Sequence, residues 1–304
     1  MIGEPGDLYS VHVEAPSLDD LRDPVLVVAL DGYVDAGNGV RLAVDSLLAS
    51  LPHSVVVTFD VDQLIDYRAR RPVLTYEKNA FIDYAAPRLV VHQVTDSDGT
   101  PFLLLSGPEP DTQWERFVAA VGEVADRLGV RLTVGLMAIP MAVPHTRPTG
   151  MSSHATRPGL LPDAEDAFGT IAVPGHATGL IEYRFGQAGR DAIGFAAHVP
   201  HYIARSDYPE TARTLLQATA DATGLLLPTA DLDAAAATVR TQLQEQIAGN
   251  AEVSAVVEAL EQQYDTFVSA TGRGLLAQSA PLPTADELGA QFEAFLADRE
   301  NPDG

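Results

Sequence analysis

Cysteine is absent from the 304 residues, and lysine occurs once, at Lys78. Without cysteine the chain forms neither disulfides nor thiolate metal sites, which excludes a secreted disulfide scaffold. No apolar run approaches the roughly 18 residues that a membrane-spanning helix needs. The first residues carry acids and prolines and lack a basic stretch ahead of an apolar one. We therefore expect a cytoplasmic protein with no membrane contact and no secretory signal.

Basic residues are scarce as a class. Lys and Arg number 19 against 42 Asp and Glu, which gives a formal net charge of −23. A field of this sign repels the phosphate backbone of nucleic acids, whose binding needs many Lys and Arg contacts. The excess of acid favours solubility or a basic protein partner. We expect no nucleic-acid partner.

A strand, a glycine-rich turn and a helix follow one another near the start of the chain. Residues 25–30 form a continuous apolar run, typical of a strand covered on both faces. The turn DGYVDAGNG (31–39) and a helical stripe come next. Similar alternation later in the chain predicts an α/β fold, a mixed sheet with helices on both sides. The expected strands are 9–13, 25–30, 54–59, 88–94, 101–105, 132–139 and 192–198. The expected helices are 41–50, 113–128 and 208–223. We expect Asp111 to be the N-cap of the helix at 113–128 and Gly129 to be its C′ residue.

Two segments depart from this alternation. Residues 146–175 are rich in Gly, Pro, Ser and Thr, which predicts a long loop that is functional, mobile or an interface element. From residue 229 onward, 13 acids against three bases accompany helical periodicity. We expect a core domain over 1–228 and an acidic helical appendage over 229–304, with helices at 231–249, 252–271 and 285–299 and a frayed end.

The turn after the first buried strand carries the first candidate site. Asp31 and Asp35 fit either an acid/base or hard-metal pair or ordinary turn chemistry, in which carboxylates bond nearby backbone N–H groups. Glycines 37 and 39 precede a helix, whose N-terminus is a potential phosphate site. They form neither a dinucleotide fingerprint nor a P-loop. The eight histidines form no compact metal signature, and Ser152 lacks a nucleophile elbow, so we expect no catalytic constellation, metal or cofactor.

An arginine cluster is the second candidate site. Arg68, Arg70 and Arg71 in DYRARRP (66–72) fit either a clamp for a carboxylate or phosphate or ion pairs within the protein, and the ion pairs are preferred. Arg147 in PHTRP presents the same two alternatives.

Several motifs together resemble one family, the proteasome assembly chaperone two family in its actinobacterial form. They are GYVDAGN (32–38), DYRARRP (66–72), LLLSGPEPDTQWERF (103–117), PHTRP (144–148) and HVPHYIARSDYPETA (198–212). The resemblance implies a three-layer α/β/α sandwich similar to that of purine nucleoside phosphorylases and related hydrolases. It also implies that the chain forms oligomers and that its partners are proteasome subunits. Proteasome-binding relatives often end in a hydrophobic–Tyr–X tail, which the final residues NPDG lack, so any such contact is expected to use another surface.

The function expected on these grounds is that of a non-enzymatic, chaperone-like or scaffolding protein acting as a homo-oligomer, with a homotrimer preferred. Trp114 is either an interface anchor or a core residue between helix and sheet, and the core position is preferred. The rival hypothesis is a binding protein or enzyme for a nucleoside-like or phosphate-like molecule. Its pocket would be formed by Asp31, Tyr33, Asp35, Asn38, Arg147 and His201.

Overall fold

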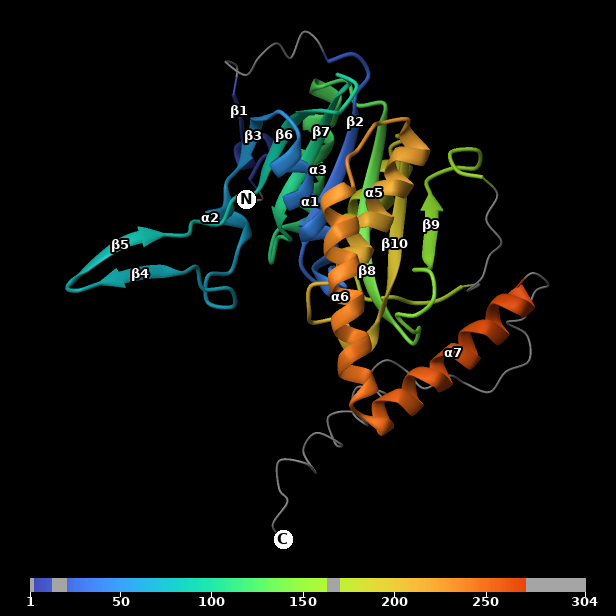
Figure 1. Cartoon of the computed structure of the whole chain (residues 1–304). Helices are drawn as coiled ribbons and strands as arrows, with labels where there is room; N and C mark the ends of the chain where they lie inside the picture. Colours follow the sequence, from blue (N-terminus) through green and yellow to red (C-terminus); the bar gives the residue numbers. More distant parts are fainter. Residues whose placement is uncertain (1–2, 13–20, 163–169, 272–304) are drawn as a thin grey trace.

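A mixed sheet of eight strands forms the centre of the molecule (Figure 1). The computed structural model describes residues 3–12, 21–162 and 170–271. Five strands run parallel to one another, and the other three run antiparallel to their neighbours. In order across the sheet they are β1 (Tyr9–Val11), β3 (His53–Phe59), β6 (Val90–Thr95), β7 (Pro101–Pro108), β2 (Val25–Asp31), β8 (Leu132–Met141), β10 (Ala192–Pro200) and β9 (Met151–Ala155), of which β1, β6 and β9 are the antiparallel ones.

Helices cover both faces of this sheet. α3 (Trp114–Arg127) and α4 (Ala177–Gln187) pack on one face, and α1 (Gly39–Ser50) and α5 (Pro209–Thr223) pack on the other. Alternate residues of β2 belong to the two cores: Leu26, Val28 and Leu30 lie against α3 and α4, whereas Val25, Val27 and Ala29 lie on the α1 and α5 side. The expected three-layer α/β/α fold is confirmed.

The strands and helices expected in the first 228 residues are present, with ends displaced by a few residues. The expectation of Asp111 as an N-cap is wrong. Its carboxylate accepts from the backbone N–H of Asp66 and from Arg70, and Gln113 stands at the N-cap of α3 with φ 57°. Gly129 does lie just beyond that helix with φ +66°, the left-handed conformation expected of a C′ glycine.

Three elements lie where no regular structure was expected. β9 lies within the predicted loop 146–175 and pairs with β10 at the edge of the sheet. Part of the predicted loop is therefore a strand. α4 follows it. A hairpin of β4 (Leu74–Glu77) and β5 (Ala80–Tyr84) projects from the body of the molecule (Figure 1). The short helices are η1 (Pro5–Leu8), η3 (Ala36–Asn38), α2 (Val61–Leu64) and η4 (His201–Ile203).

Two acidic helices follow the sheet, α6 (Ala230–Ala248) and α7 (Ala251–Thr271). α6 lies along α5 and buries Leu232 and Ala236, and α7 turns back across the lower end of the sheet in Figure 1. The third expected helix of this region, at 285–299, lies outside the described residues. None of the helices in the described part of the chain has the length and apolar character needed to cross a membrane.

Candidate functional site

The carboxyl ends of three neighbouring parallel strands carry the six residues predicted to form a pocket. Asp31 is the last residue of β2, and Tyr33, Asp35 and Asn38 stand in the turn that follows. Arg147 lies in the loop after β8, and His201 follows β10 directly. Because β2, β8 and β10 are adjacent and parallel, these segments meet at one edge of the sheet, the carboxyl edge, where α/β proteins usually bind ligands.

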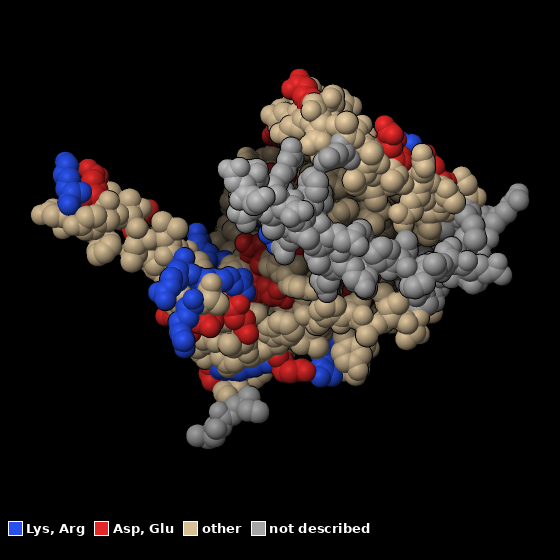
Figure 2. Space-filling model, turned by 90° about the horizontal axis from the view of Figure 1, so that it is seen from below, with Lys and Arg blue, Asp and Glu red and all other residues tan. Residues whose placement is uncertain are grey.

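Figure 2 shows this edge from below. Acidic side chains lie in the middle of the face, and basic side chains gather beside them at the base of the projecting hairpin.

Asp31 presents an unsatisfied carboxylate oxygen at the carboxyl edge. Its Oδ1 atom is buried and has no hydrogen-bond partner among the described residues. Burial raises the pKa of the carboxyl group, and the positive charge of Arg70 opposes that rise. A buried carboxylate oxygen that lacks a donor is a feature that points to a ligand group.

Glu109, which the sequence reasoning did not single out, ties three segments of this edge together. It is only 7% exposed. One carboxylate oxygen accepts from the backbone N–H of Ala177 at 2.7 Å, at the start of α4, and the other accepts from the N–H of Tyr33 at 3.1 Å. Gly32 lies against this side chain, where a Cβ would come within 2.6 Å of the carboxylate. Glu109 therefore fixes the turn after β2 against α4.

The carboxylate of Asp35 binds backbone N–H groups at the N-terminus of α1. Its Oδ1 accepts from the N–H of Val40 at 2.6 Å, and Oδ2 accepts from the N–H of Arg41 at 3.3 Å. These two donors are among the amides that a phosphate at this helix would use, so the chain's own carboxylate occupies them. Burial raises the pKa of Asp35 to about 7, against which the two backbone hydrogen bonds act, and the nearby charge of Asp31 adds to the rise.

Asn38 and Arg147 bind other parts of the chain. Asn38 donates from Nδ2 to Asp207 at 2.6 Å. The guanidinium of Arg147 forms two parallel bonds with Asp265 of α7, Nε to Oδ1 at 2.8 Å and Nη2 to Oδ2 at 2.7 Å. Tyr264 of the same helix donates to the carbonyl of Pro148 at 3.2 Å. The PHTRP loop is thus fastened to α7, and Arg147 forms an intramolecular ion pair.

His201 lies beside a small aromatic cluster. Its Nδ1 is buried and has no hydrogen-bond partner in the described part of the chain, and burial lowers the pKa of the ring. Tyr202 packs edge-on against His201 and against His145, and its hydroxyl lies 2.7 Å from Nδ1 of His145. The Nε2 atom of His145 is likewise buried without a partner among the described residues. These rings are neutral at pH 7 and supply polar atoms with free hydrogen-bonding capacity.

The arginine cluster divides between the two interpretations. Arg70 forms an ion pair with Asp111 and donates to the carbonyl of Glu109, which agrees with the preferred ion pair. The side chains of Arg68 and Arg71 are exposed and form no ion pair with any described residue. Trp114 at the start of α3 is partly buried, with its indole N–H donating to the carbonyl of Pro110 at 2.5 Å and Gly175 against its ring.

A serine–histidine pair that the sequence did not indicate lies on the β9–β10 ladder. Ser152 Oγ and His198 Nε2 are 2.9 Å apart. Among the described residues no carboxylate bonds to His198, so the pair lacks the third group that orients a catalytic imidazole. Within the same residues no three His, Asp or Glu side chains are grouped to hold a metal ion.

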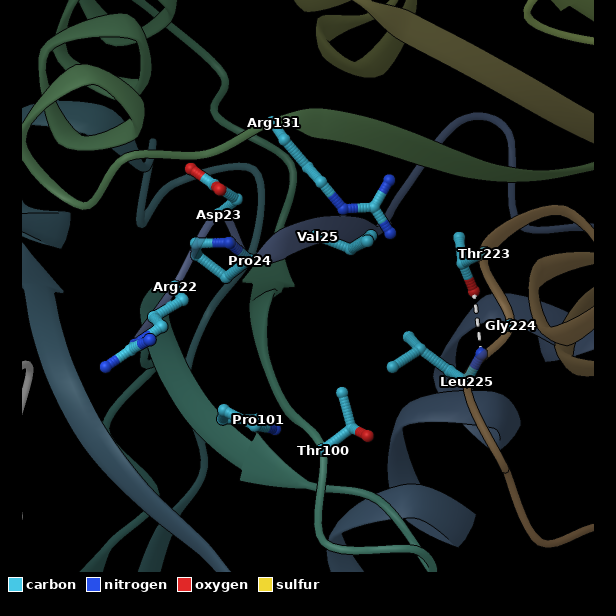
Figure 3. Close-up of a pocket in the computed structure, with 10 residues that line it drawn as sticks. All are labelled: Arg22, Asp23, Pro24, Val25, Thr100, Pro101, Arg131, Thr223, Gly224 and Leu225. Atoms are coloured by element: carbon cyan, nitrogen blue, oxygen red, sulfur yellow. Dashed lines mark hydrogen bonds between the residues drawn. The ribbon is translucent and has the colours of Figure 1, made fainter. Parts of the chain in front are cut away.

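A cavity of about 340 Å³ lies at the opposite, amino-terminal edge of the sheet (Figure 3). Arg131 points into it, whereas Arg22 and Asp23 point away. None of the six predicted pocket residues lines this cavity. It offers one cation beside mostly backbone and apolar surface, and its described lining holds no acid/base pair.

Known proteins match both the sequence and the fold. Residues 29–247 match the model of the PAC2 family. The structure of Rv2714, a Mycobacterium tuberculosis protein of unknown function, is 48% identical with a TM-score of 0.83, covering 88% of this chain and 94% of that one. A Corynebacterium glutamicum protein of unknown function is 40% identical with a TM-score of 0.82, covering 86% and 98%.

A third solved structure is similar over most of this chain. Rv2125, described as a proteasome-assembly chaperone homologue from Mycobacterium tuberculosis, is 28% identical with a TM-score of 0.69, covering 77% of this chain and 99% of that one. Among curated protein sequences there is no match.

Proposed function

The chain belongs to the PAC2 family, and from this membership we propose that it is a non-enzymatic, chaperone-like scaffold that binds proteasome subunits. We place it in the cytoplasm, as a homo-oligomer for which a homotrimer is the preferred form. The similarity to the proteasome-assembly chaperone homologue Rv2125 supports the choice of partner.

One observation at the carboxyl edge carries the non-enzymatic part of the proposal. Three of the six predicted pocket residues already have partners in the chain: Asp35 holds the N-terminus of α1, Asn38 holds Asp207, and Arg147 holds α7. Side chains committed to the fold are poorly placed to change partners during a reaction. The acidic helices α6 and α7, part of the proposed appendage 229–304, then provide a contact surface for a partner.

A second candidate function is the binding of a small molecule at the same edge. It is favoured by two buried atoms that lack partners among the described residues, Oδ1 of Asp31 and Nδ1 of His201. A ligand with a hydroxyl or amide donor would satisfy the carboxylate oxygen, as a nucleoside would.

The test compares the two functions with the same protein. Immobilised full-length chain is exposed to purified proteasome α- and β-subunits, and binding is measured by interferometry. We expect saturable binding that Asp31→Asn leaves unchanged, together with no thermal shift from nucleosides or inorganic phosphate. Absence of binding to either subunit would refute the scaffold. A nucleoside-induced stabilisation that Asp31→Asn abolishes would establish the second function instead.

A further inference from the structure

The cavity at the amino-terminal edge of the sheet, hereafter the amino-edge cavity, has no part in the proposed function (Figure 3). β7, β2 and β8 are neighbours in the sheet and run parallel, so their first residues lie side by side. The segments that begin these three strands and the end of α5 together form a cavity of about 340 Å³, a volume within the range of small-molecule sites. Its lining residues are 22–25, 100–101, 131 and 223–225.

A buried carboxylate holds two walls of this cavity in place. Asp96 is 5% exposed and lies in the turn before β7. One of its oxygens accepts from the backbone N–H of Thr100 at 2.7 Å, and the other accepts from the N–H of Leu226 at 2.8 Å, so the turn is fixed to the segment after α5. The segment before β8 is tied to the start of β2, because the N–H of Arg131 donates to the carbonyl of Pro24 at 3.0 Å. The walls are therefore in place before a ligand arrives.

The guanidinium of Arg131 points into the amino-edge cavity (Figure 3). It forms no ion pair with any residue in the described part of the chain. Asp23 is the one acid among the described lining residues, and its side chain points away. A guanidinium presents its N–H donors in a planar fork that matches the two oxygens of a carboxylate. The cavity thus offers a cation whose charge is not neutralised by its surroundings.

The surroundings of Arg131 favour a ligand with a single negative charge. Phosphate sites normally use free N–H groups at the start of a helix, whereas this cavity adjoins the end of α5, where the helix dipole is negative. The backbone amides of Thr100, Gly224 and Leu225 already donate to acceptors within the chain. The guanidinium is left to bind the anion, and one guanidinium matches one carboxylate.

The walls beside the guanidinium are apolar. Val25 and Leu225 are buried and belong to the core on the α1 and α5 side of the sheet. Pro24 and Pro101 add ring carbons and have no backbone N–H to donate. Hydrocarbon that contacts these walls is removed from water, which favours its binding. A ligand that fills the cavity therefore carries an apolar body beside its carboxylate.

We propose that the amino-edge cavity binds a small monocarboxylate with an apolar body. The carboxylate pairs with the guanidinium of Arg131, and the hydrocarbon lies against Pro24, Pro101 and Leu225. This site lies at the opposite edge of the sheet from the six predicted pocket residues, and it does not depend on the binding of proteasome subunits.

The test uses benzoate and hexanoate as probes, one aromatic and one aliphatic monocarboxylate. Their binding to the full-length chain is measured by saturation-transfer NMR, with neutral benzamide as the matched control for benzoate. We expect saturable binding of at least one of the two carboxylates, with a Kd of about 1 mM or below. Arg131→Gln should weaken that binding by about tenfold or more, because it removes hydrogen bonds between two charged groups.

Arg22→Gln is the matched control variant. Arg22 lines the same cavity and is exposed like Arg131, but its side chain points away (Figure 3). Its replacement removes the same charge from the same edge and should change the Kd by less than about twofold. Equal urea midpoints for the two variants would show that both remain folded.

Three results would overturn the inference: failure of both carboxylates to bind, a Kd that Arg131→Gln leaves unchanged, or benzamide that binds as tightly as benzoate. Inorganic phosphate that displaces benzoate at concentrations below the Kd of benzoate would also overturn it, and would assign the cavity to a phosphate ligand.

Discussion

Replacement of Asp35 by asparagine should stabilise the protein, and by more at pH 8 than at pH 4. Burial raises the pKa of this carboxyl group to about 7 in the folded chain, whereas in the unfolded chain it titrates near 3.9. As the pH rises from about 4 to about 7, the unfolded state loses its proton and the folded state retains it, so the free energy of unfolding falls. Above pH 7 the loss is constant.

The size of the effect follows from the difference between the two pKa values. Each unit corresponds to about 1.4 kcal/mol, and the difference of about three units predicts a penalty of about 4 kcal/mol at pH 8. The amide that Asp35→Asn introduces does not titrate, and its oxygen can still accept from the N–H of Val40, so the variant escapes this penalty. The difference in unfolding free energy between variant and wild type should therefore grow by about 4 kcal/mol from pH 4 to pH 8.

Histidines make the comparison with wild type necessary. Burial lowers the pKa of His92 to about 4 and also lowers those of His145, His176, His198 and His201. These groups add stability as the pH rises toward about 6.5, opposite in sign to Asp35. Because both proteins contain them, their contribution cancels in the difference.

Urea unfolding followed by tryptophan fluorescence or circular dichroism at half-unit steps of pH gives both curves. Asp98→Asn is the matched control, because it makes the same change of group at an exposed carboxylate in the turn after β6. A difference for Asp35→Asn that is independent of pH, or that favours the wild type as the pH rises, would falsify the reasoning. The charged carboxylate would then stabilise the end of α1 by more than its burial costs.

Three further experiments have expected outcomes of defined sign. Gly39→Ala places a Cβ 2.3 Å from Cγ2 of Thr211 and should lower the free energy of unfolding by about 1–3 kcal/mol. Gly122→Ala, where the nearest atom is 3.5 Å away, should raise it by up to about 1 kcal/mol, and equal urea midpoints for the two would contradict the steric argument. Arg147→Gln should release α7 from the PHTRP loop and speed the cleavage of α7 by chymotrypsin. The control Arg157→Gln breaks a similar ion pair with Asp191 and should leave the cleavage of α7 unchanged. Protection of α7 in both variants would show that the ion pair between Arg147 and Asp265 does not hold α7 in place. Arg70→Gln should raise the pKa of Asp31 further in a carboxyl NMR titration, since the charge of Arg70 opposes the effect of burial. An unchanged pKa of Asp31 would show that Arg70 lies too far from this carboxyl group to affect its charge.

The buried strands could be predicted from the sequence because a strand that is buried on both faces is an uninterrupted run of apolar residues. Residues 25–30 are apolar without interruption, since one half of them faces α3 and α4 and the other half faces α1 and α5. β9 escaped prediction because Met151–Ala155 is a polar edge strand that β10 holds by backbone pairing. α4 was not predicted because it contains glycines 179 and 186 and follows a glycine and a proline, which are residues typical of loops.

The β4–β5 hairpin was not predicted for a different reason. Alternation in Leu74–Glu77 is a strand signal that could have been found. Its turn contains Lys78 and Asn79 in place of the glycine-containing pairs typical of two-residue hairpins, and Lys78 adopts φ 56°.

The candidate residues lie together at one edge because the carboxyl ends of parallel strands converge there. Their partners could not be foreseen. Arg147 binds Asp265, 118 positions later in the chain, and Glu109 reaches Ala177 across 68 positions. Contacts of this kind depend on where α7 and α4 come to lie, which no local pattern of residues encodes.

The carboxylate of Asp35 occupies the N-terminus of α1 in the way that a bound phosphate would. It sits five positions before Val40, whose N–H it accepts, and such a short tether corresponds to an effective concentration in the millimolar range or above. A free phosphate would have to compete with this tethered anion for the same two amides. Because burial raises the pKa of this carboxyl group to about 7, its charged form is the less stable occupant of the site, so the pH range in which phosphate carries most charge is also the range in which Asp35 holds the site least firmly.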